Sequence, residues 1–171
     1  MKKNNLILIG FMGVGKGTVA RALVAKYDLF AIDTDDIIES QAKKKIKEIF
    51  KKEGEEYFRN LEQKCADWLE SSVDNTVIST GGGFYKRANI QEIGKIVYLK
   101  SSFEGILNRI GNSPNAIKKL KKRPLLQDIA EAKKLFNARV PEYENIADII
   151  VDVEDRNVND IIKDIMKKSK A

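Results

Sequence analysis

The chain alternates short apolar runs with longer stretches in which apolar residues recur at the spacing of an amphipathic helix. The short runs are too short for helices and are followed by turn or capping residues, so they predict buried strands. Strands that alternate with helices predict an α/β fold, with a five-stranded parallel sheet and helices on both faces in three α/β/α layers. The expected strands are Leu6–Ile9, Phe30–Ile32, Val77–Ile78, Ile96–Leu99 and Ile149–Val151. The expected helices are Lys16–Lys26, Thr34–Gln41, Ile46–Lys52, Glu55–Ser71, Ser102–Arg109, Ile129–Asn145 and Val158–Lys168.

The length of 171 residues and the apolar content of 43% are typical of one globular domain with its own core. No internal repeat, low-complexity linker or change of composition divides the sequence, so we expect a single domain over 1–171. No apolar stretch approaches the roughly 18 residues of a membrane span. We therefore expect a cytoplasmic protein that has no membrane partner, and, separately, we expect it to be a monomer.

The absence of histidine restricts the chemistry further. It excludes histidine-based catalytic triads, histidine zinc ligands and imidazole general bases. A single cysteine, Cys65, cannot form a disulfide within the chain, and we expect it to be buried and unreactive. Acid–base chemistry must therefore fall to Asp, Glu, Lys or Tyr.

The charge balance favours anionic partners, since 31 Lys and Arg residues exceed 25 Asp and Glu residues and give a net charge of +6. Arginine binds carboxylates and phosphates through two parallel hydrogen bonds, so the few arginines are the more informative cations. They are Arg21, Arg59, Arg87, Arg109, Arg123, Arg139 and Arg156.

A phosphate-binding loop follows the first expected strand. Within the loop 10–18, residues 10–16 match the pattern G-x-x-x-x-G-K between a strand and a helix, and Lys16 is placed to reach the β and γ phosphates of a nucleotide. Gly17 stands where this pattern normally has Ser or Thr for Mg²⁺. We therefore expect Mg²⁺ near Gly17, Thr18 and Asp33, held through nucleotide oxygens and water, and its direct protein ligand stays open.

Two carboxylates follow the second expected strand. One of Asp33 and Asp35 could accept a hydroxyl proton or anchor hydrated Mg²⁺, while the other could hold substrate hydroxyl groups. The alternative is that an aspartate caps the following helix, and the sequence favours that role most for Asp36.

Other candidate positions have equally plain alternatives. Gly81, Gly82 and Gly83 follow the third strand and would let backbone approach a ligand, or they form a flexible turn. Arg59 and Arg139 could bind a carboxylate, or they lie on helix surfaces, where Arg59 would pair with Glu55 or Glu62. Turn residues and then dense positive charge over 110–124 predict a basic lid, in which Arg123 is the candidate for binding the transferred phosphoryl group.

Six segments taken together resemble the shikimate kinase family along essentially the whole chain. They are GFMGVGKGT, DTDD, GEEYFRNLE, ISTGGG, RPLL and RVPEYENIAD, in that order. The resemblance implies a P-loop kinase fold similar to that of nucleoside monophosphate kinases, with a substrate-binding region over about 34–61. It also implies ATP-dependent phosphorylation of the 3-hydroxyl of shikimate, a step of aromatic amino-acid biosynthesis that gives shikimate 3-phosphate and ADP.

The resemblance also implies residue roles. The catalytic residues would be Lys16, Asp33 and Arg123. ATP would be bound by Gly13, Val14, Gly15, Lys16, Gly17 and Thr18, together with Arg109, Arg123 and Arg156. Shikimate would be bound by Asp35, Arg59, Gly81, Gly82, Gly83 and Arg139.

Two alternatives remain at this stage. Another small P-loop kinase, acting on gluconate or a nucleoside monophosphate, would share the phosphate loop. A basic nucleic-acid-binding protein would share the net charge of +6, but the lysine runs are scattered and lack interleaved aromatic residues, so we expect no nucleic-acid partner.

Overall fold

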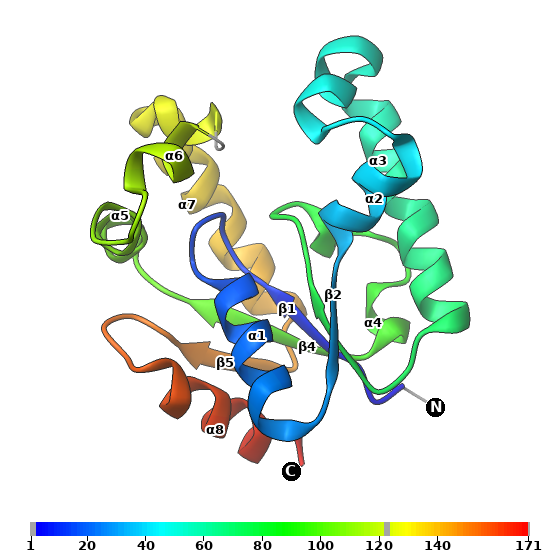
Figure 1. The fold of residues 1–171 in the computed structure, drawn as a ribbon, viewed down its shortest axis with the longest axis vertical. Helices are drawn as coiled ribbons and strands as arrows, with labels where there is room; N and C mark the ends of the chain where they lie inside the picture. Colours follow the sequence, from blue (N-terminus) through cyan, green and yellow to red (C-terminus); the bar gives the residue numbers. More distant parts are fainter. Residues whose placement is uncertain (1–2, 122–123, 171) are drawn as a thin grey trace.

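A five-stranded parallel sheet forms the centre of the computed structural model, which describes residues 3–121 and 124–170 (Figure 1). The strand order is β2-β3-β1-β4-β5, and all neighbouring strands are parallel. Each connection between two strands therefore crosses one face of the sheet. The α/β fold expected from the sequence is confirmed. The strands are β1 (Leu6–Ile9), β2 (Phe30–Asp33), β3 (Thr76–Ser79), β4 (Lys95–Lys100) and β5 (Ile149–Asp152).

Helices cover both faces of this sheet. One layer contains α1 and α8, which contact each other and pack on β3 and β5, while α7 packs on β4 and α4 packs against α3. Four short elements were not expected from the sequence: α4, α6 and the 3₁₀ turns η1 and η2. The helices are α1 (Lys16–Tyr27), α2 (Thr34–Ala42), α3 (Ile46–Ser72), α4 (Ile90–Ile93), α5 (Phe103–Gly111), α6 (Ala116–Lys121), α7 (Ile129–Ile146) and α8 (Val158–Ser169); η1 is Phe84–Lys86 and η2 is Pro124–Gln127.

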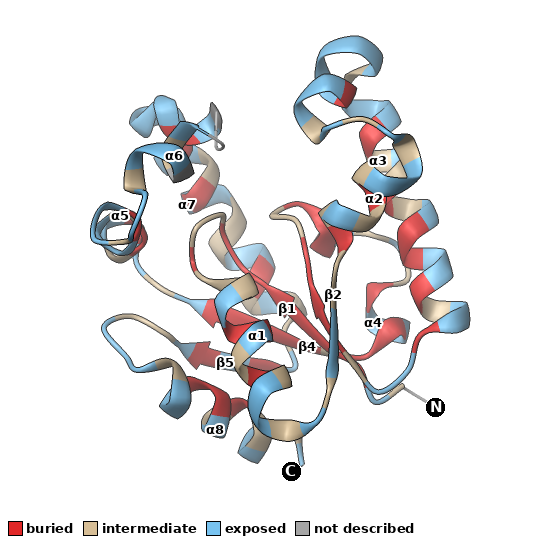
Figure 2. Cartoon of the chain, viewed as in Figure 1, coloured by how far each residue is buried: buried red, intermediate tan, exposed pale blue. Residues whose placement is uncertain are grey.

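The sheet is buried at its centre and exposed along one edge (Figure 2). Every residue of β1 is buried because β1 pairs with β3 on one side and β4 on the other. In contrast, β2 pairs only with β3. Phe30 on β2 is 83% exposed, so the expectation of a buried strand is wrong there.

The long helix α3 contains a bend at Gly54. This residue has φ 86° and ψ 172°, a conformation that only glycine adopts readily, and it separates two helical parts. The sequence predicts two helices here, Ile46–Lys52 and Glu55–Ser71, and the bend lies between them. Because α2 and α3 pack together, the bend sets how this helical region projects above the sheet (Figure 1).

The carboxyl ends of the strands meet at one edge of the sheet, as parallel pairing requires. Ser79 is in register with Leu8 of β1 and with Asp33 of β2. The next residue, Thr80, donates from its backbone nitrogen and its hydroxyl to the carbonyl oxygen of Leu8, at 3.3 and 2.9 Å. The loops that follow β1, β2 and β3 therefore lie side by side.

Across residues 3–121 and 124–170, no helix is both long enough and apolar enough to span a membrane.

Candidate active site

The loop after β1 has the backbone geometry of a phosphate-binding loop. Gly13 and Gly15 have φ values of 82° and 110°, which allow the tight turn before α1. No side chain caps the start of α1, so its first N–H groups face the loop. Lys16 Nζ donates to the carbonyl oxygens of Gly10 at 2.7 Å and Phe11 at 3.2 Å, which places the ammonium group across the loop.

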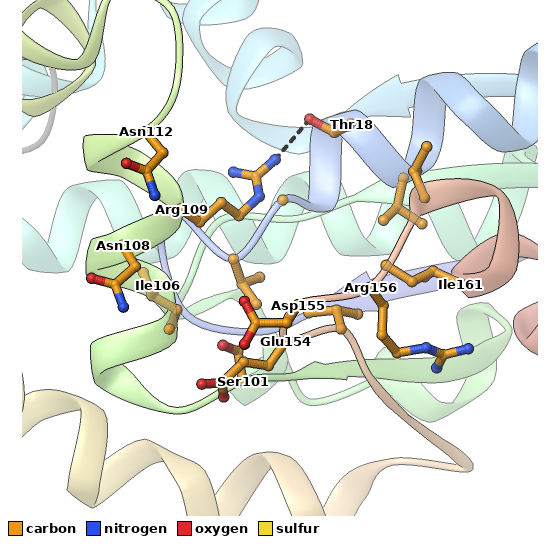
Figure 3. Close-up of a pocket in the computed structure, with 16 residues that line it drawn as sticks. Thr18, Ser101, Ile106, Asn108, Arg109, Asn112, Glu154, Asp155, Arg156 and Ile161 are labelled. Carbon is orange, nitrogen blue, oxygen red and sulfur yellow. Dashed lines mark hydrogen bonds between the residues drawn. The ribbon is translucent and has the colours of Figure 1, made fainter.

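Arg109 of α5 extends over this loop (Figure 3). Its Nη1 donates to the carbonyl oxygen of Gly13 and its Nη2 to the hydroxyl of Thr18, both at 3.1 Å. A Cβ on Gly15 would lie 2.9 Å from Arg109 Nη2, so glycine allows this close approach. Burial, and then the charge of Arg21, lower the pKa of Arg109 from its ordinary value.

A cavity of about 310 Å³ lies beneath Arg109. Figure 3 shows that its walls come from the phosphate loop, α5 and the segment after β5. Its mixed polar and apolar lining, adjoining the phosphate loop, suits a nucleotide base and ribose. The lining residues include Val14, Thr18, Ser101, Ile106, Asn108, Asn112, Glu154, Asp155, Val158 and Ile161.

Arg156 also lines this cavity, but its guanidinium has partners of its own. Nη1 donates to the carbonyl oxygen of Asp152 at 2.9 Å, and Nη2 pairs with Asp164 at 2.7 Å. Glu154, which sequence reasoning missed, accepts from the backbone nitrogen and hydroxyl of Ser102, the N-cap of α5. No local motif marks Glu154, because it joins segments 52 residues apart.

Asp33 ends β2 and caps α2. Its Oδ1 accepts from the backbone nitrogens of Asp35 at 2.9 Å and Asp36 at 3.3 Å. The capping role that the sequence favoured for Asp36 therefore belongs to Asp33, because Asp33 is the last extended residue before the helix. This contact fixes the Asp33 carboxylate at the strand end.

Asp35 is the most strongly perturbed carboxyl group of the site. Burial, with the charges of Asp33 and Glu62, raises its pKa from 3.8 to about 7, against the opposing charge of Lys16. Its Oδ1 is buried and has no hydrogen-bond partner among the described residues. An acceptor atom of this kind, near the phosphate-loop lysine, is suited to a ligand hydroxyl group.

The three glycines after β3 each face a different charged side chain that the sequence analysis singled out. A Cβ on Gly81 would lie 2.7 Å from Asp35 Oδ1, one on Gly82 would lie 2.8 Å from Arg139 Nη1, and one on Gly83 would lie 2.6 Å from Arg59 Nη1. Any larger residue would displace these groups. The structure thus brings together one carboxylate and two guanidinium groups from α2, α3 and α7 around one loop.

Two further contacts hold this loop in place. The hydroxyl of Thr34 accepts from the backbone nitrogen of Gly81 at 3.2 Å. The hydroxyl of Tyr143, a fully buried residue of α7, donates to the carbonyl oxygen of Gly82 at 2.6 Å. The loop is therefore tied to α2 and α7, and it is not the flexible turn that the sequence also allowed.

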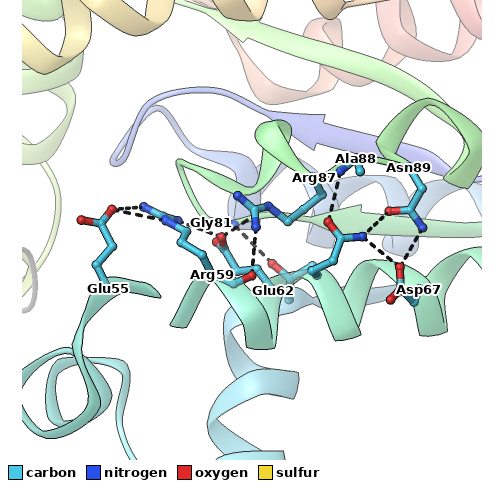
Figure 4. Close-up of polar contacts among 10 residues, drawn as sticks. Glu55, Arg59, Glu62, Asp67, Gly81, Arg87, Ala88 and Asn89 are labelled. Carbon is cyan, nitrogen blue, oxygen red and sulfur yellow. Dashed lines mark hydrogen bonds and ion pairs between the residues drawn. The ribbon is translucent and has the colours of Figure 1, made fainter. Parts of the chain in front are cut away.

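Arg59 makes both of the ion pairs that the sequence left as alternatives (Figure 4). Nη2 lies 3.1 Å from Glu55 Oε1, and Nη1 lies 2.8 Å from Glu62 Oε2. The Arg59 side chain is only 25% exposed and lies against Gly83, so these pairs orient it toward the glycine loop. The sequence offered Glu62 only as a partner of Arg59 on a helix surface, and its burial was not expected, because nothing in a helical pattern marks one glutamate as buried.

Two other expectations concern Arg123 and Cys65. Arg123 lies outside the described residues. Cys65 is buried as expected, and burial with the nearby charge of Glu62 raises the pKa of its thiol to about 12. Residues 3–121 and 124–170 contain no group of three or more Cys, Asp or Glu side chains able to hold a metal ion by themselves.

The sheet order and the phosphate loop define this chain as a P-loop kinase of the small-molecule type. The shikimate kinase family model matches residues 12–170. The chain therefore belongs to the shikimate kinase family, as its motifs indicated.

Relatives and solved structures named as shikimate kinases agree with this family. The chain is 40% identical to the shikimate kinase of Helicobacter hepaticus, over 86% of this chain and 85% of that protein, and 34% identical to that of Dictyoglomus turgidum, over 97% of both. Shikimate kinase from Acinetobacter baumannii, solved in complex with shikimate, superposes with a TM-score of 0.80 and 31% identity over 96% of this chain and 92% of that chain. These matches favour shikimate kinase over the gluconate and nucleoside monophosphate kinase alternatives.

Proposed function

We propose that the chain transfers the γ-phosphoryl group of ATP to the 3-hydroxyl of shikimate, giving shikimate 3-phosphate and ADP in aromatic amino-acid biosynthesis. The observation that carries this proposal is the convergence of Asp35, Arg59 and Arg139 on glycines 81–83. A small molecule with one carboxylate and several hydroxyl groups needs this set of cations and acceptors. The similarity to the Acinetobacter enzyme, whose structure contains shikimate, supports the same substrate.

In this proposal the two guanidinium groups of Arg59 and Arg139 bind the shikimate carboxylate. Asp35 Oδ1, which lacks a partner among the described residues, accepts from a shikimate hydroxyl group. Asp33 is held at the strand end by its contacts with the start of α2 and lies nearest the reacting 3-hydroxyl. Because phosphoryl transfer depends mainly on positioning and charge stabilisation, Asp33 need not be a strong base.

ATP is proposed to occupy the phosphate loop and the cavity beside it. The backbone of residues 13–18 binds the phosphates, with Lys16 exchanging its contacts to loop carbonyls for phosphate oxygens. Arg109 packs on the adenine, and Arg156 forms part of the pocket wall. The family resemblance supports a lid role for the basic segment over 110–124, and Arg123, which lies outside the described residues, is the candidate for binding the transferred phosphoryl group.

The residues present fit a Mg²⁺ ion held mainly by ATP. Gly17 offers no hydroxyl ligand, and the hydroxyl of Thr18 already accepts from Arg109. We propose that Asp33 anchors the hydrated ion through water. When bound, Mg²⁺ supplies positive charge that neutralises the phosphate oxygens.

A coupled assay of ADP release, with shikimate, gluconate and AMP as acceptors, tests the proposed function. We expect turnover with shikimate alone, and phosphorus NMR of the product should place the phosphate on the 3-hydroxyl. Lys16→Met is the negative control. Loss of turnover in this variant would show that the measured ADP release depends on the phosphate loop. Turnover with AMP or gluconate but not with shikimate would contradict the proposal.

A further inference from the structure

Arg87 lies immediately after η1, on the segment that continues from the glycine loop, and its side chain is only 13% exposed. Two contacts tie it to α3 (Figure 4). Its Nη1 donates to the backbone carbonyl oxygen of Arg59 at 2.9 Å, and its Nε lies 3.7 Å from Glu62 Oε2. Arg87 therefore touches both the backbone of Arg59 and the carboxylate that orients the Arg59 side chain.

Glu62 is the centre of this arrangement. Its side chain is 1% exposed, and a buried carboxylate is costly unless cations and hydrogen bonds compensate it. The same oxygen, Oε2, faces Arg59 Nη1 at 2.8 Å and Arg87 Nε at 3.7 Å. Two guanidinium groups thus share one buried carboxylate, which leaves the cluster of Arg59, Glu62 and Arg87 with one positive charge.

That single positive charge matters for an acidic ligand at Arg59. The exposed Glu55 is screened by water, so Glu62 would neutralise Arg59 if Arg87 were absent, and Arg139 alone would supply positive charge for an incoming carboxylate near Asp35. With Arg87 present, the ligand carboxylate brings the cluster to neutrality. The difference is large in a poorly hydrated site, where charges are weakly screened.

The segment that carries Arg87 is fixed along the same face of α3. The Gln63 side chain accepts from the backbone nitrogen of Ala88 at 3.1 Å and donates to Asn89 Oδ1 at 2.9 Å. Asn89 in turn donates to Asp67. These contacts hold Arg87 in register with Arg59 and Glu62, and Figure 4 shows the pair of Asn89 and Asp67 among them.

We propose that Arg87 is a positioning residue for the acidic substrate: it compensates the buried charge of Glu62, so that the positive charge of Arg59 stays available for the substrate carboxylate in the orientation that Glu62 gives it. This inference rests on the proposed function. Lys86, the preceding residue, is a matched control because it is a 55%-exposed cation on the same segment and pairs with Glu142 instead.

The first test compares steady-state kinetics of Arg87→Met, Arg87→Lys and Lys86→Met. For Arg87→Met we expect the KM for shikimate to rise roughly tenfold, while kcat and the KM for ATP stay within about twofold. Arg87→Lys keeps the charge and should recover most of the affinity, and Lys86→Met should match the parent enzyme. An unchanged KM for shikimate in Arg87→Met would overturn the proposal.

The second test separates charge compensation from a structural role. Shikimate methyl ester carries no carboxylate, so its KM should be nearly the same for the parent enzyme and Arg87→Met. Adding Glu62→Gln to Arg87→Met removes the uncompensated charge and should lower the KM for shikimate again. Equal losses with acid and ester, together with no recovery in the double variant, would mean that Arg87 only maintains structure and would overturn the proposal.

These outcomes are distinct from failure of the proposed function. If the parent enzyme does not phosphorylate shikimate, the function itself is wrong. If Arg87→Met does not fold, as judged by circular dichroism, Arg87→Gln, which keeps a hydrogen-bond donor without the charge, takes its place. A ratio of acid to ester KM values that equals the parent ratio in Arg87→Gln would also overturn the role of Arg87.

Discussion

The guanidinium of Arg59 lies directly against the backbone of Gly83. A Cβ on Gly83 would be 2.6 Å from Nη1 of Arg59, closer than a Cβ approaches an atom to which it is not bonded, and 3.0 Å from its Cζ. The arginine is held in this place by Glu62 and Glu55 on its other side. Position 83 therefore requires glycine because the Arg59 side chain of α3 lies against it. The backbone conformation at this position does not by itself require glycine.

Gly83→Ala should displace Arg59 and weaken shikimate binding. We expect the KM for shikimate to rise by roughly one to two orders of magnitude, because a catalytic or binding group shifted by about 1 Å loses its alignment. The KM for ATP should stay within about twofold, since the phosphate loop is untouched. Both constants come from one steady-state kinetic series, and equal increases in the two would contradict this account.

Asp35→Asn should make the protein more stable at alkaline pH. The folded chain keeps the Asp35 proton up to a pKa of about 7, whereas the ordinary value is 3.8, so the folded state binds more protons between these values. The stabilising contribution of the protonated Asp35 to folding is therefore fully present below pH 3.8. It is lost as the pH rises through 7. Removing the carboxyl group removes the unfavourable charge that remains above pH 7.

Thermal unfolding at pH 5 and pH 8 measures this effect. The melting temperature of Asp35→Asn should exceed that of the parent by about 2–5 °C at pH 8, and by less at pH 5. Asp36→Asn, on the same turn but exposed, is the control and should show a smaller difference. A gain for Asp35→Asn that is the same at both pH values would exclude titration of this carboxyl group as the cause.

The sequence predicts the elements well where the pattern is local. The bounds of β1 are the same in sequence and structure, and β4 extends only to Lys95 and Lys100, because backbone pairing continues past the apolar residues. The short helices α4 and α6 were missed, since four and six residues are too few to show helical periodicity. Phe30 was expected to be buried, but the order of the strands, which no local pattern reveals, puts β2 at the edge.

The same limit applies to the candidate site. Motifs indicated Asp35, Arg59 and Arg139, and the structure brings them to one loop. The supporting residues Glu62 and Arg87 carry no such signal, because their contact joins positions 25 residues apart in sequence and depends on burial. What sequence reasoning misses is therefore mainly the set of residues that hold the binding groups in place.

Gly54→Ala should destabilise the protein without changing the site chemistry. Gly54 has φ 86° and ψ 172°, which costs a residue with a Cβ about 1–3 kcal/mol, even though no other atom lies within 4 Å of a Cβ built there. Urea unfolding should show this loss. Lys52→Ala, at an exposed position just before the bend, is the control and should be close to neutral. Equal stability of the two variants would contradict the role of the bend.

Gly17→Ser should strengthen metal binding. Gly17 is in the first turn of α1 with an ordinary helical backbone, and a Cβ there would meet only Nη1 of Arg21, at 3.3 Å. Arg21 is an exposed, flexible side chain and can move aside. The serine hydroxyl would then stand at the position where phosphate loops normally supply a Mg²⁺ ligand. We expect the Mg²⁺ concentration for half-maximal turnover to fall several-fold at fixed ATP. Gly17→Ala is the matched control, because it adds the Cβ without the hydroxyl, and it should leave the Mg²⁺ requirement unchanged. If serine and alanine shift the requirement equally, the hydroxyl is not acting as a ligand, and the metal is held without a side chain from this position.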